Sequence, residues 1–442
     1  MNENQYGFRQ QHSTSHALNF SVHHIEKRLK NREHVVGIFI DLSKAFDTID
    51  HILLLVKLER YGIRGNTLKL LGSYLTGRYQ YTSVLNEISN RLPVLYGVPQ
   101  GSVLGPLLFL IYINDISNCS NLAKFVLFAD DTNIFVTGMS KVDAYIKANT
   151  ILESIYNYMI ANKLHVNTKK CCYIYFRPKI SSKKAIDSTV YDNLVLKMHD
   201  NILEQVTQTK FLGVIIDEEL SWIPHINYKT TKLKCCMGSL NRIKENVPAS
   251  LHKSLYHTLF ESHLTYGITV WGGAPDKYID QLFTVQKMCM RIMFGDKEAY
   301  LDKFKTCSRT RPIEEQLLGA EFYTREHTKP LFSCKSIMTI HNLYIYHTTL
   351  AALKIFKFRT PMPLYCCFNL SKRKETLLIT PWSSRNFIYQ ASSIWNTVRS
   401  KIDTKDFSVK LGKVKLQLKN LILKRQKLGD QTEWSEDNFR LG

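Results

Sequence analysis

Hydrophobic and polar residues alternate in different ways along the chain. Val35–Ile40 is a short run of apolar residues and one glycine, as in a buried strand, and Phe125–Phe128 and Ile134–Val136 are two apolar runs separated by a few polar residues, as in a tight hairpin. In Pro224–Lys244 and Ser408–Leu428 apolar residues instead recur at helical intervals among many lysines. The pattern therefore predicts a mixed α+β fold.

Acidic residues stand where the predicted strands end. Asp41 directly follows the first strand, and Asp130 and Asp131 lie at the tip of the hairpin. Burying unpaired carboxylates costs several kcal/mol or forces them to protonate, so a cation at the tip would account for the pair, and all-oxygen ligands favour magnesium or manganese over zinc. If the three acids converge, they can hold two ions about 3.5–4 Å apart, as two-metal phosphoryl transfer requires. We expect Asp47 and Asp50, which lie beyond the strand, to cap a helix or face solvent.

A glycine-rich segment, Gly97–Pro106, lies between the acids in the sequence. Its glycines at 97, 101 and 105 allow a backbone to approach a ligand closely, and Ser102 or Pro106 can open a helix whose N-terminal amides favour phosphate. A plain Gly-Pro turn would explain part of this pattern. Its position between the acids favours a binding loop.

With these segments in place, the chain strongly resembles a reverse transcriptase, and specifically the polymerase of non-long-terminal-repeat retrotransposons of the LINE-like, jockey type. Six motifs occur in order, at Gln5–Arg9 with Ser13–Thr14, Ile40–Asp47, Gly97–Pro106, Phe128–Thr132, Asn162–Lys170 and Phe211–Val214. Six ordered motifs are far more specific than any one of them. The resemblance covers roughly residues 1–300.

The resemblance implies an α+β right-hand polymerase with a ferredoxin-like antiparallel palm, partial fingers, a helical thumb and a helical C-terminal extension. Residues 1–216 would form the partial fingers and the palm, 217–300 the thumb and 301–442 the extension. Because the family has further fingers segments before the Gln5–Arg9 motif, and full-length relatives carry an upstream endonuclease, we expect an N-terminally truncated chain.

The resemblance also implies roles for individual residues. Asp41 and Asp130 would be the principal ligands of two Mg²⁺ or Mn²⁺ ions, with Asp131 as the supporting acid. Phe46 would be the steric gate that excludes a ribose 2′-hydroxyl. The implied nucleotide-binding residues are Arg9, as the triphosphate contact, with Gln100, Gly101 and Lys170, and the implied primer grip is Phe211, Leu212 and Gly213.

Several of these residues have a simpler alternative role. Arg9 and Lys170 could be ordinary surface cations, Phe46 could be a core residue, and Gln100 could hydrogen-bond within its own loop. Phe211 is expected to be buried in either case.

The implied reaction is RNA-directed DNA synthesis, in which deoxynucleoside triphosphates extend a DNA primer on an RNA template by two-metal nucleotidyl transfer. Two other functions stay open. One is a viral RNA-dependent RNA polymerase, against which Ala129 before the acid pair and Phe46 at the gate position both argue. The other is a truncated, catalytically inactive relic that still binds nucleic acid.

Composition agrees with a nucleic-acid partner. The formal net charge is +21 and the pI is about 9.4, which favours a polyanion, although a basic pI could also serve membrane or ribosome association. No apolar run approaches the roughly 18 residues of a membrane helix, and the first residues are too polar for a signal peptide. We therefore expect no membrane partner and an intracellular protein, which by resemblance would enter the nucleus during integration. The ten cysteines include no Cys-x-x-Cys pair, so we expect reduced thiols and no zinc.

The second half of the chain is expected to be helical. By resemblance, Pro224–Lys244 begins the thumb, and His263–Gly272 and Val285–Ile292 are paired helices whose basic faces would follow the duplex. A solvated charged face is the alternative for any one lysine. We expect the basic helix at Ser408–Leu428 to pack on the body rather than to contact a membrane or RNA.

Overall fold

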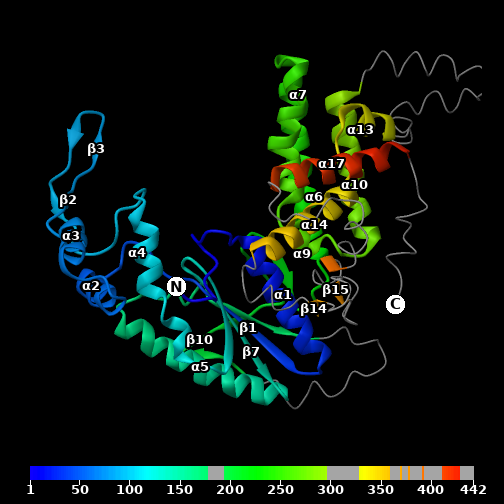
Figure 1. Cartoon of the computed structure of the whole chain (residues 1–442). Coiled ribbons are helices and arrows are strands. Elements are labelled where there is room, and N and C mark those ends of the chain that lie inside the picture. The colour runs from blue at the N-terminus through cyan, green and yellow to red at the C-terminus, as the bar shows by residue number, and fades with distance from the viewer. Residues whose placement is uncertain are drawn as a thin grey trace, which may run out of the picture. The chain divides into compact units, whose positions relative to one another are not determined.

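A computed structural model of the chain is shown in Figure 1. It describes residues 1–177, 194–295, 328–358, 369–370, 377–378, 391–392 and 411–428. Contacts divide the chain into two compact units, of which unit 1 begins at Met1 and extends to Leu220 and unit 2 begins at Ser221. Much of the predicted C-terminal extension, including Ser408, lies outside the described residues.

A five-stranded sheet forms the centre of unit 1. Its strands are β1 (His34–Ile40), β6 (Ala123–Phe128), β7 (Asp131–Gly138), β8 (Cys172–Phe176) and β11 (Glu204–Gln205), in the spatial order β11-β8-β1-β7-β6. Three of the pairings, β8-β1, β1-β7 and β7-β6, are antiparallel, whereas β11 joins β8 in parallel. The sheet is therefore mixed and not wholly antiparallel as predicted, because two polar residues without a strand pattern add the fifth strand.

Two helices, α1 (Thr14–Lys30) and α5 (Lys141–Ala161), cover opposite faces of this sheet. The other helices of unit 1 are α2 (His51–Arg60), which packs against α3 (Gly65–Leu75) and α4 (Leu104–Ile113), and a 3₁₀ turn at Ile116–Cys119. On one face Ile38 and Ile134 pack in the same core cluster as Ile151 and Ile155 of α5. On the other face Phe135 contacts His24 of α1. Side chains alternate between the two faces of a strand, so both faces of β1 and β7 are buried.

Short two-stranded ribbons complete unit 1. They are β2 (Tyr79–Gln80) with β5 (Leu92–Pro93), β3 (Ser83–Val84) with β4 (Glu87–Ile88), β9 (Lys197–Met198) with β10 (Asn201–Ile202), and β12 (Gln208–Phe211) with β13 (Val214–Asp217). The β12–β13 hairpin packs on the α1 face of the sheet, because the ring of Phe211 lies 5.7 Å from that of Phe39 and 6.5 Å from that of Phe135.

Unit 2 is largely helical in its described residues. Its elements are α6 (Ile223–Ile243), a 3₁₀ turn (Lys244–Asn246), α7 (Ala249–Leu255), a π-helical segment (Tyr256–Glu261), α8 (Ser262–Thr265), α9 (Ile268–Trp271), α10 (Asp276–Phe294), α13 (Lys329–Lys335), α14 (Ile340–Phe358) and α17 (Leu411–Leu428), with the short strands β14 (Asn369–Leu370) and β15 (Leu377–Leu378). The helix predicted at 224–244 is confirmed as α6. The segment predicted as one helix at 263–272 is two, since Gly267 between them has a φ of 68°.

Two lysine-rich helices of unit 2 pack against their neighbours. In α6, Lys229 is only 6% exposed, and its ammonium donates to the carbonyls of His263 and Tyr266 and lies 5.1 Å from the ring centre of Trp271. The sequence pattern shows this helix as apolar positions among many lysines, and the structure buries one of those lysines. α17 contacts α13 and α14 and buries Leu418, as predicted for packing on the body. Among the described residues, none of the helices has the length and apolar character needed to cross a membrane.

Candidate active site

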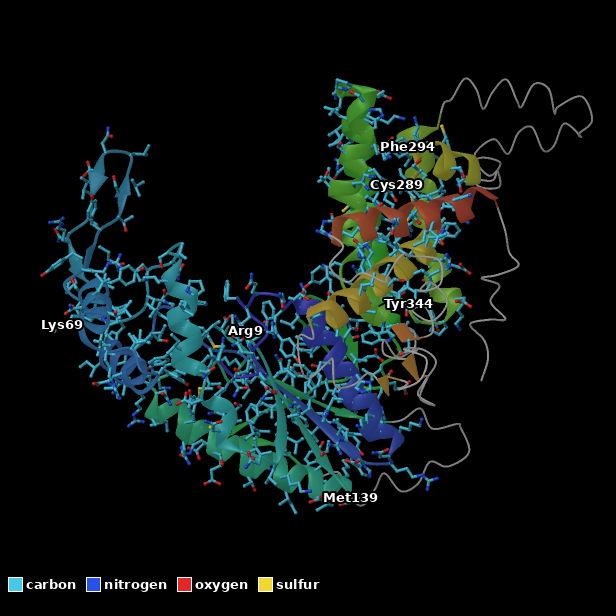
Figure 2. The ribbon with its side chains drawn as sticks, in the orientation of Figure 1. Arg9, Lys69, Met139, Cys289, Phe294 and Tyr344 are labelled. Carbon is cyan, nitrogen blue, oxygen red and sulfur yellow. The ribbon has the colours of Figure 1, made fainter. Side chains whose placement is uncertain are left out.

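The register of β1 and β7 brings the three predicted acids to one end of the sheet. Ile40, the last residue of β1, pairs with Thr132. Asp41 is the residue after Ile40, and Asp131 is the residue before Thr132, so the register brings the two acids to the same end of the strand pair. Asp131 in turn pairs with Phe128 across the two-residue turn Ala129–Asp130, in which Ala129 has a φ of 55°. The predicted tight hairpin is confirmed. In Figure 2, Arg9 and Met139, which follows β7, lie toward opposite ends of this sheet.

Desolvation and the negative charges of Asp130 and Asp41 affect the pKa of Asp131. Asp131 is exposed as a whole residue, but the surrounding protein partly removes its carboxylate from water. This desolvation raises the pKa of Asp131 to about 6, together with the smaller effect of the negative charges of Asp130 and Asp41. Several carboxylate oxygens drawn together in this way are the donors that Mg²⁺ and Mn²⁺ prefer, so the residues suit hard divalent cations. In the conformation described, over the described part of the chain, no three His, Cys, Asp or Glu side chains form a ready metal-binding group.

Lys170 lies beside this acidic group. Its ammonium is 3.8 Å from Oδ2 of Asp41, and the lysine side chain is 70% exposed. Such an exposed pair contributes little to stability. The structure thus places Lys170 both at the predicted site and on the surface, and its contact with pyrophosphate stays a prediction.

The backbone of Asp41 is held by the segment that precedes β8. The N–H of Asn167 donates to the carbonyl of Asp41 at 2.9 Å, and the N–H of Asp41 points to Sγ of Cys171 at 3.5 Å. Cys171 is buried, and that burial raises its pKa to about 11, so the thiol stays neutral near pH 7. This contact could not be predicted, because nothing in the local sequence pairs Cys171 with a residue 130 positions away.

The N-terminal segment holds the acidic hairpin from its other side. Tyr6 donates its N–H to the carbonyl of Leu127 at 2.8 Å. Gln5 is buried, and its Oε1 accepts the N–H groups of Gly7 at 2.7 Å and Ala129 at 3.1 Å. A Cβ atom on Gly7 would come within 2.4 Å of the Ala129 nitrogen, so only glycine fits there. Gln5 and Gly7 belong to the first of the six motifs, but the resemblance implied no role for either residue.

Arg9 is tied to the same N-terminal segment. Its Nη1 donates to the carbonyls of Asn2 at 2.6 Å and Gln5 at 3.0 Å. Burial lowers the pKa of the guanidinium, although an arginine stays charged near neutral pH. The predicted contact with a triphosphate stays a prediction.

The glycine-rich loop is anchored to the segment after Asp41. Gly97 has a φ of 85°, and a Cβ atom there would lie 2.8 Å from the Cα of Asp47. Gln100 donates from Nε2 to Oδ1 of Asp47 at 2.8 Å, so its partner lies outside its own loop. Gly101 also has a positive φ, 81°, but faces open space. The expected helix opens here as α4, and the Oγ of Ser102 accepts the N–H of Gly105 at 2.9 Å.

Phe46 and Asp50 have clear structural contacts. The Phe46 ring stacks on that of Phe109 with centroids 4.6 Å apart, and it is partly buried against the core. Its role as a sugar gate stays a prediction. Asp50 caps α2 as expected, since Oδ1 accepts the N–H of Leu53 at 2.9 Å, and its Oδ2 pairs with Lys163 at 2.7 Å.

The segment predicted as a primer grip forms the turn between β12 and β13. Leu212 and Gly213 have φ values of 45° and 81°, as in a tight two-residue turn, and Phe211 is buried as expected. Whether this hairpin holds a primer stays a prediction.

Comparison with known proteins supports the same family. Residues 1–216 match the reverse transcriptase (RNA-dependent DNA polymerase) family. The RNA-directed DNA polymerase from mobile element jockey of Drosophila melanogaster is 25% identical over 327 residues, which are 71% of this chain and 33% of that protein. The probable RNA-directed DNA polymerase from transposon X-element, of the same organism, is 28% identical over 303 residues, 66% of this chain and 32% of that protein.

Among solved structures, apo telomerase from Candida tropicalis aligns over 80% of this chain and 57% of that chain at 12% identity, with a TM-score of 0.35, which is too low for a comparison of folds. This chain spans about a third of the length of the curated relatives named above. Residues 1–216 therefore belong to the reverse transcriptase family, and the chain is similar to the polymerases of the jockey- and X-element-like non-LTR retrotransposons.

Proposed function

We propose that this chain is an RNA-directed DNA polymerase that extends a DNA 3′ end on an RNA template with deoxynucleoside triphosphates. The observation that carries the proposal is the pairing of Ile40 with Thr132, because this register delivers Asp41 to the acidic hairpin that holds Asp130 and Asp131. The raised pKa of Asp131 supports the same grouping. A nucleotidyl transfer site needs acids gathered in this way.

The topology of unit 1 supports a polymerase palm. Apart from the short strands β2 to β5, the chain from β1 to β8 runs strand, helices, strand, strand, helix, strand, and the four strands lie in the order β8-β1-β7-β6. This order supports a ferredoxin-like βαββαβ palm. Residues 1–216 would then be palm and partial fingers of a right-hand polymerase, 217–300 a helical thumb and 301–442 a helical extension.

Asp41, Asp130 and Asp131 would hold two Mg²⁺ or Mn²⁺ ions. When bound, such ions increase the acidity of a primer hydroxyl and stabilise the charge of a leaving pyrophosphate. Lys170, beside Asp41, would balance negative charge as pyrophosphate departs. Phe46 would exclude a ribose 2′-hydroxyl by contact.

Further residues would position the two substrates. Arg9, Gln100 and Gly101 would contact the incoming nucleotide, for which Gln100 must exchange its bond to Asp47. Phe211, Leu212 and Gly213 would hold the primer end in line with the reacting phosphate.

Primer extension on an RNA template, with Mg²⁺ or Mn²⁺, tests the proposal. The parent should incorporate deoxynucleotides and Asp130→Asn should not. Asp143→Asn makes the same chemical change at a partly exposed residue of α5 that pairs with Lys147, and it should behave as the parent. Equal traces from the parent and Asp130→Asn would contradict the proposal.

Two outcomes of this assay would point to the alternative functions. A parent chain that binds a primed template but adds no nucleotide would identify an inactive relic. Preference for ribonucleotides would identify an RNA polymerase, and Phe46→Ala should increase ribonucleotide use if the ring is the gate.

A further inference from the structure

A slender two-stranded ribbon extends from unit 1 between α3 and the glycine-rich loop. We call residues 78–93 the arm. In the arm β2 pairs with β5 and β3 pairs with β4, and Leu85 and Asn86 form the tip, both with positive φ. Figure 1 shows β2 and β3 standing clear of α3. Every residue from Thr76 to Pro93 is exposed.

The arm exposes more apolar surface than is compatible with a stable isolated ribbon in water. A single hairpin is at best marginally stable in water, and it gains stability only when one of its faces is covered. The large exposed side chains of the arm are Tyr79, Tyr81, Val84, Leu85, Ile88 and Leu92, each at least half exposed. Such a concentration of apolar groups marks a surface that binds a partner.

The two faces of the arm differ in chemistry. Tyr79 and Gln80 are neighbours in β2, so their side chains lie on opposite faces of the ribbon, and Tyr81 directly follows this strand. Arg91 lies with Tyr81, because its guanidinium is 5.9 Å from the centre of that ring. The only carboxylate of the arm, that of Glu87, belongs to the separate β3–β4 ribbon, where it pairs with Val84.

The charged residues around the arm favour a negatively charged partner. Between residues 61 and 98 the basic side chains are Arg64, Lys69, Arg78 and Arg91, and the only acid is Glu87. Arg78 lies 5.9 Å from the ring centre of Tyr74. Over the described parts of the chain, neither Arg78 nor Arg91 forms an ion pair with a carboxylate, so both can meet phosphates.

We propose that the surface of the arm formed by Tyr79, Tyr81 and Arg91 binds single-stranded nucleic acid. Bases would stack on the tyrosine rings, and arginines would contact the backbone phosphates, a combination typical of sequence-tolerant single-strand binding. The binding does not depend on catalysis and goes beyond the proposed polymerase function.

The arm also leads directly to the candidate active site. After β5 the chain passes through Tyr96, which bridges to Asp50, and Gly97, whose N–H donates to the carbonyl of Ile49 at 2.8 Å. Gln100 and its bond to Asp47 follow three residues later. The arm is therefore joined through a short, anchored segment to the loop that bonds to Asp47, six residues after Asp41.

Fluorescence anisotropy with labelled single-stranded oligonucleotides tests this proposal, without nucleotides or divalent cations, so that a failure of polymerase activity would not affect the result. Tyr79→Ala and Tyr81→Ala should each weaken binding on the order of 5- to 150-fold. Arg91→Ala should lower the salt dependence of log K by about 0.7. RNA and DNA oligonucleotides are run in parallel, and the tighter of the two identifies the natural strand.

Matched variants separate binding from folding. Gln80→Ala, on the opposite face of the same strand, should bind as the parent, and the double variant Tyr79→Phe, Tyr81→Phe, which keeps both rings, should retain binding. Photocrosslinking of 4-thiouridine RNA to the unmodified chain should label a peptide of the arm. The proposal is overturned if the alanine variants bind as the parent, if Gln80→Ala weakens binding equally, or if no arm peptide is labelled. It is also overturned if the tyrosine variants change only the oligomeric state in sedimentation, because the partner would then be a second copy of the chain.

Discussion

Gln5 and Ala129 are joined by a hydrogen bond between segments 124 residues apart, from the Ala129 N–H to Gln5 Oε1 at 3.1 Å. Ala129 is the left-handed residue of the turn that carries Asp130. The same oxygen also accepts the N–H of Gly7, which fixes the orientation of the amide group, because a flipped amide would face both donors with its NH₂. A buried side chain thus sets the backbone of the acidic turn.

Gln5→Met should loosen this turn. The change keeps the length of the side chain but leaves two buried N–H groups without their acceptor, at a cost of about 1–3 kcal/mol each. We expect faster hydrogen exchange at the Ala129 amide and unchanged exchange in the β1–β7 ladder, measured by NMR. Gln5→Glu keeps an acceptor and should preserve protection of that amide. Unchanged exchange at Ala129 in Gln5→Met would contradict a positioning role.

Binding of Mn²⁺ should weaken as the pH falls through about 6, the value to which crowding and the neighbouring acids raise the pKa of Asp131. An ordinary aspartate would lose the ion nearer pH 4. Titration of Mn²⁺ followed by EPR measures this. Without metal, Asp41→Asn removes one negative neighbour and should lower the pKa of Asp131 itself, which NMR of the Asp131 carboxylate would detect as a shift of the titration midpoint to lower pH. A midpoint that stays in place in Asp41→Asn would disprove the electrostatic coupling.

Without added metal, a lower pH should stabilise the folded chain, whereas it weakens the binding of Mn²⁺. The native state holds the Asp131 proton more tightly than the unfolded chain, so the free energy of unfolding should increase as the pH falls from 7 through about 6. Asp131→Asn should remove this increase, which urea unfolding at several pH values would detect.

Alanine at Gly97 should be far more damaging than alanine at Gly101. Both glycines have positive φ, which costs a non-glycine residue about 1 kcal/mol or more. Only at Gly97 would the new Cβ also collide with backbone, 2.8 Å from the Cα of Asp47. Urea unfolding of the two variants provides the comparison, with each serving as the control of the other. Equal losses would mean that the loop moves away from Asp47 at little cost.

Lys229 should make the stability of the chain depend on pH in the neutral range. Burial lowers its pKa to about 7, so the folded state releases this proton more readily than the unfolded chain. The stabilising contribution is therefore smallest below about pH 7 and grows as the pH rises toward the ordinary lysine value. The melting temperature of the parent minus that of Lys229→Met should increase from about pH 7 to about pH 9. Lys232→Met, at an exposed position of α6, should show no such trend.

Local sequence patterns predicted the acidic hairpin and the placement of Asp41 well. Apolar runs that flank two acids at hairpin spacing leave few other conformations, and a buried strand that ends on an acid places that acid at the edge of the sheet. Family resemblance then supplied what spacing could not, namely that residues 41 and 130 belong to one site.

Contacts between distant segments were beyond the reach of the sequence. The simpler alternative for Gln100 was a hydrogen bond within its own loop, yet it bonds to Asp47, which is 53 residues away. The burial of Lys229 depends on carbonyls of His263 and Tyr266, which lie 34 and 37 residues further along the chain. Glu204–Gln205 join the sheet because the chain returns beside β8 and not because of their own propensity.

The pairing of Ile40 with Thr132 also restricts how related chains can differ in length. One residue inserted within β1 or β7 would rotate every later side chain to the opposite side of the pleat and carry Asp41 or Asp131 away from its fellows. The arm lies in the connection between Asp41 and β6 and is exposed throughout, so it can grow or shrink without altering that alignment. Insertions and deletions among homologous elements should therefore accumulate in the arm and be absent from the two central strands.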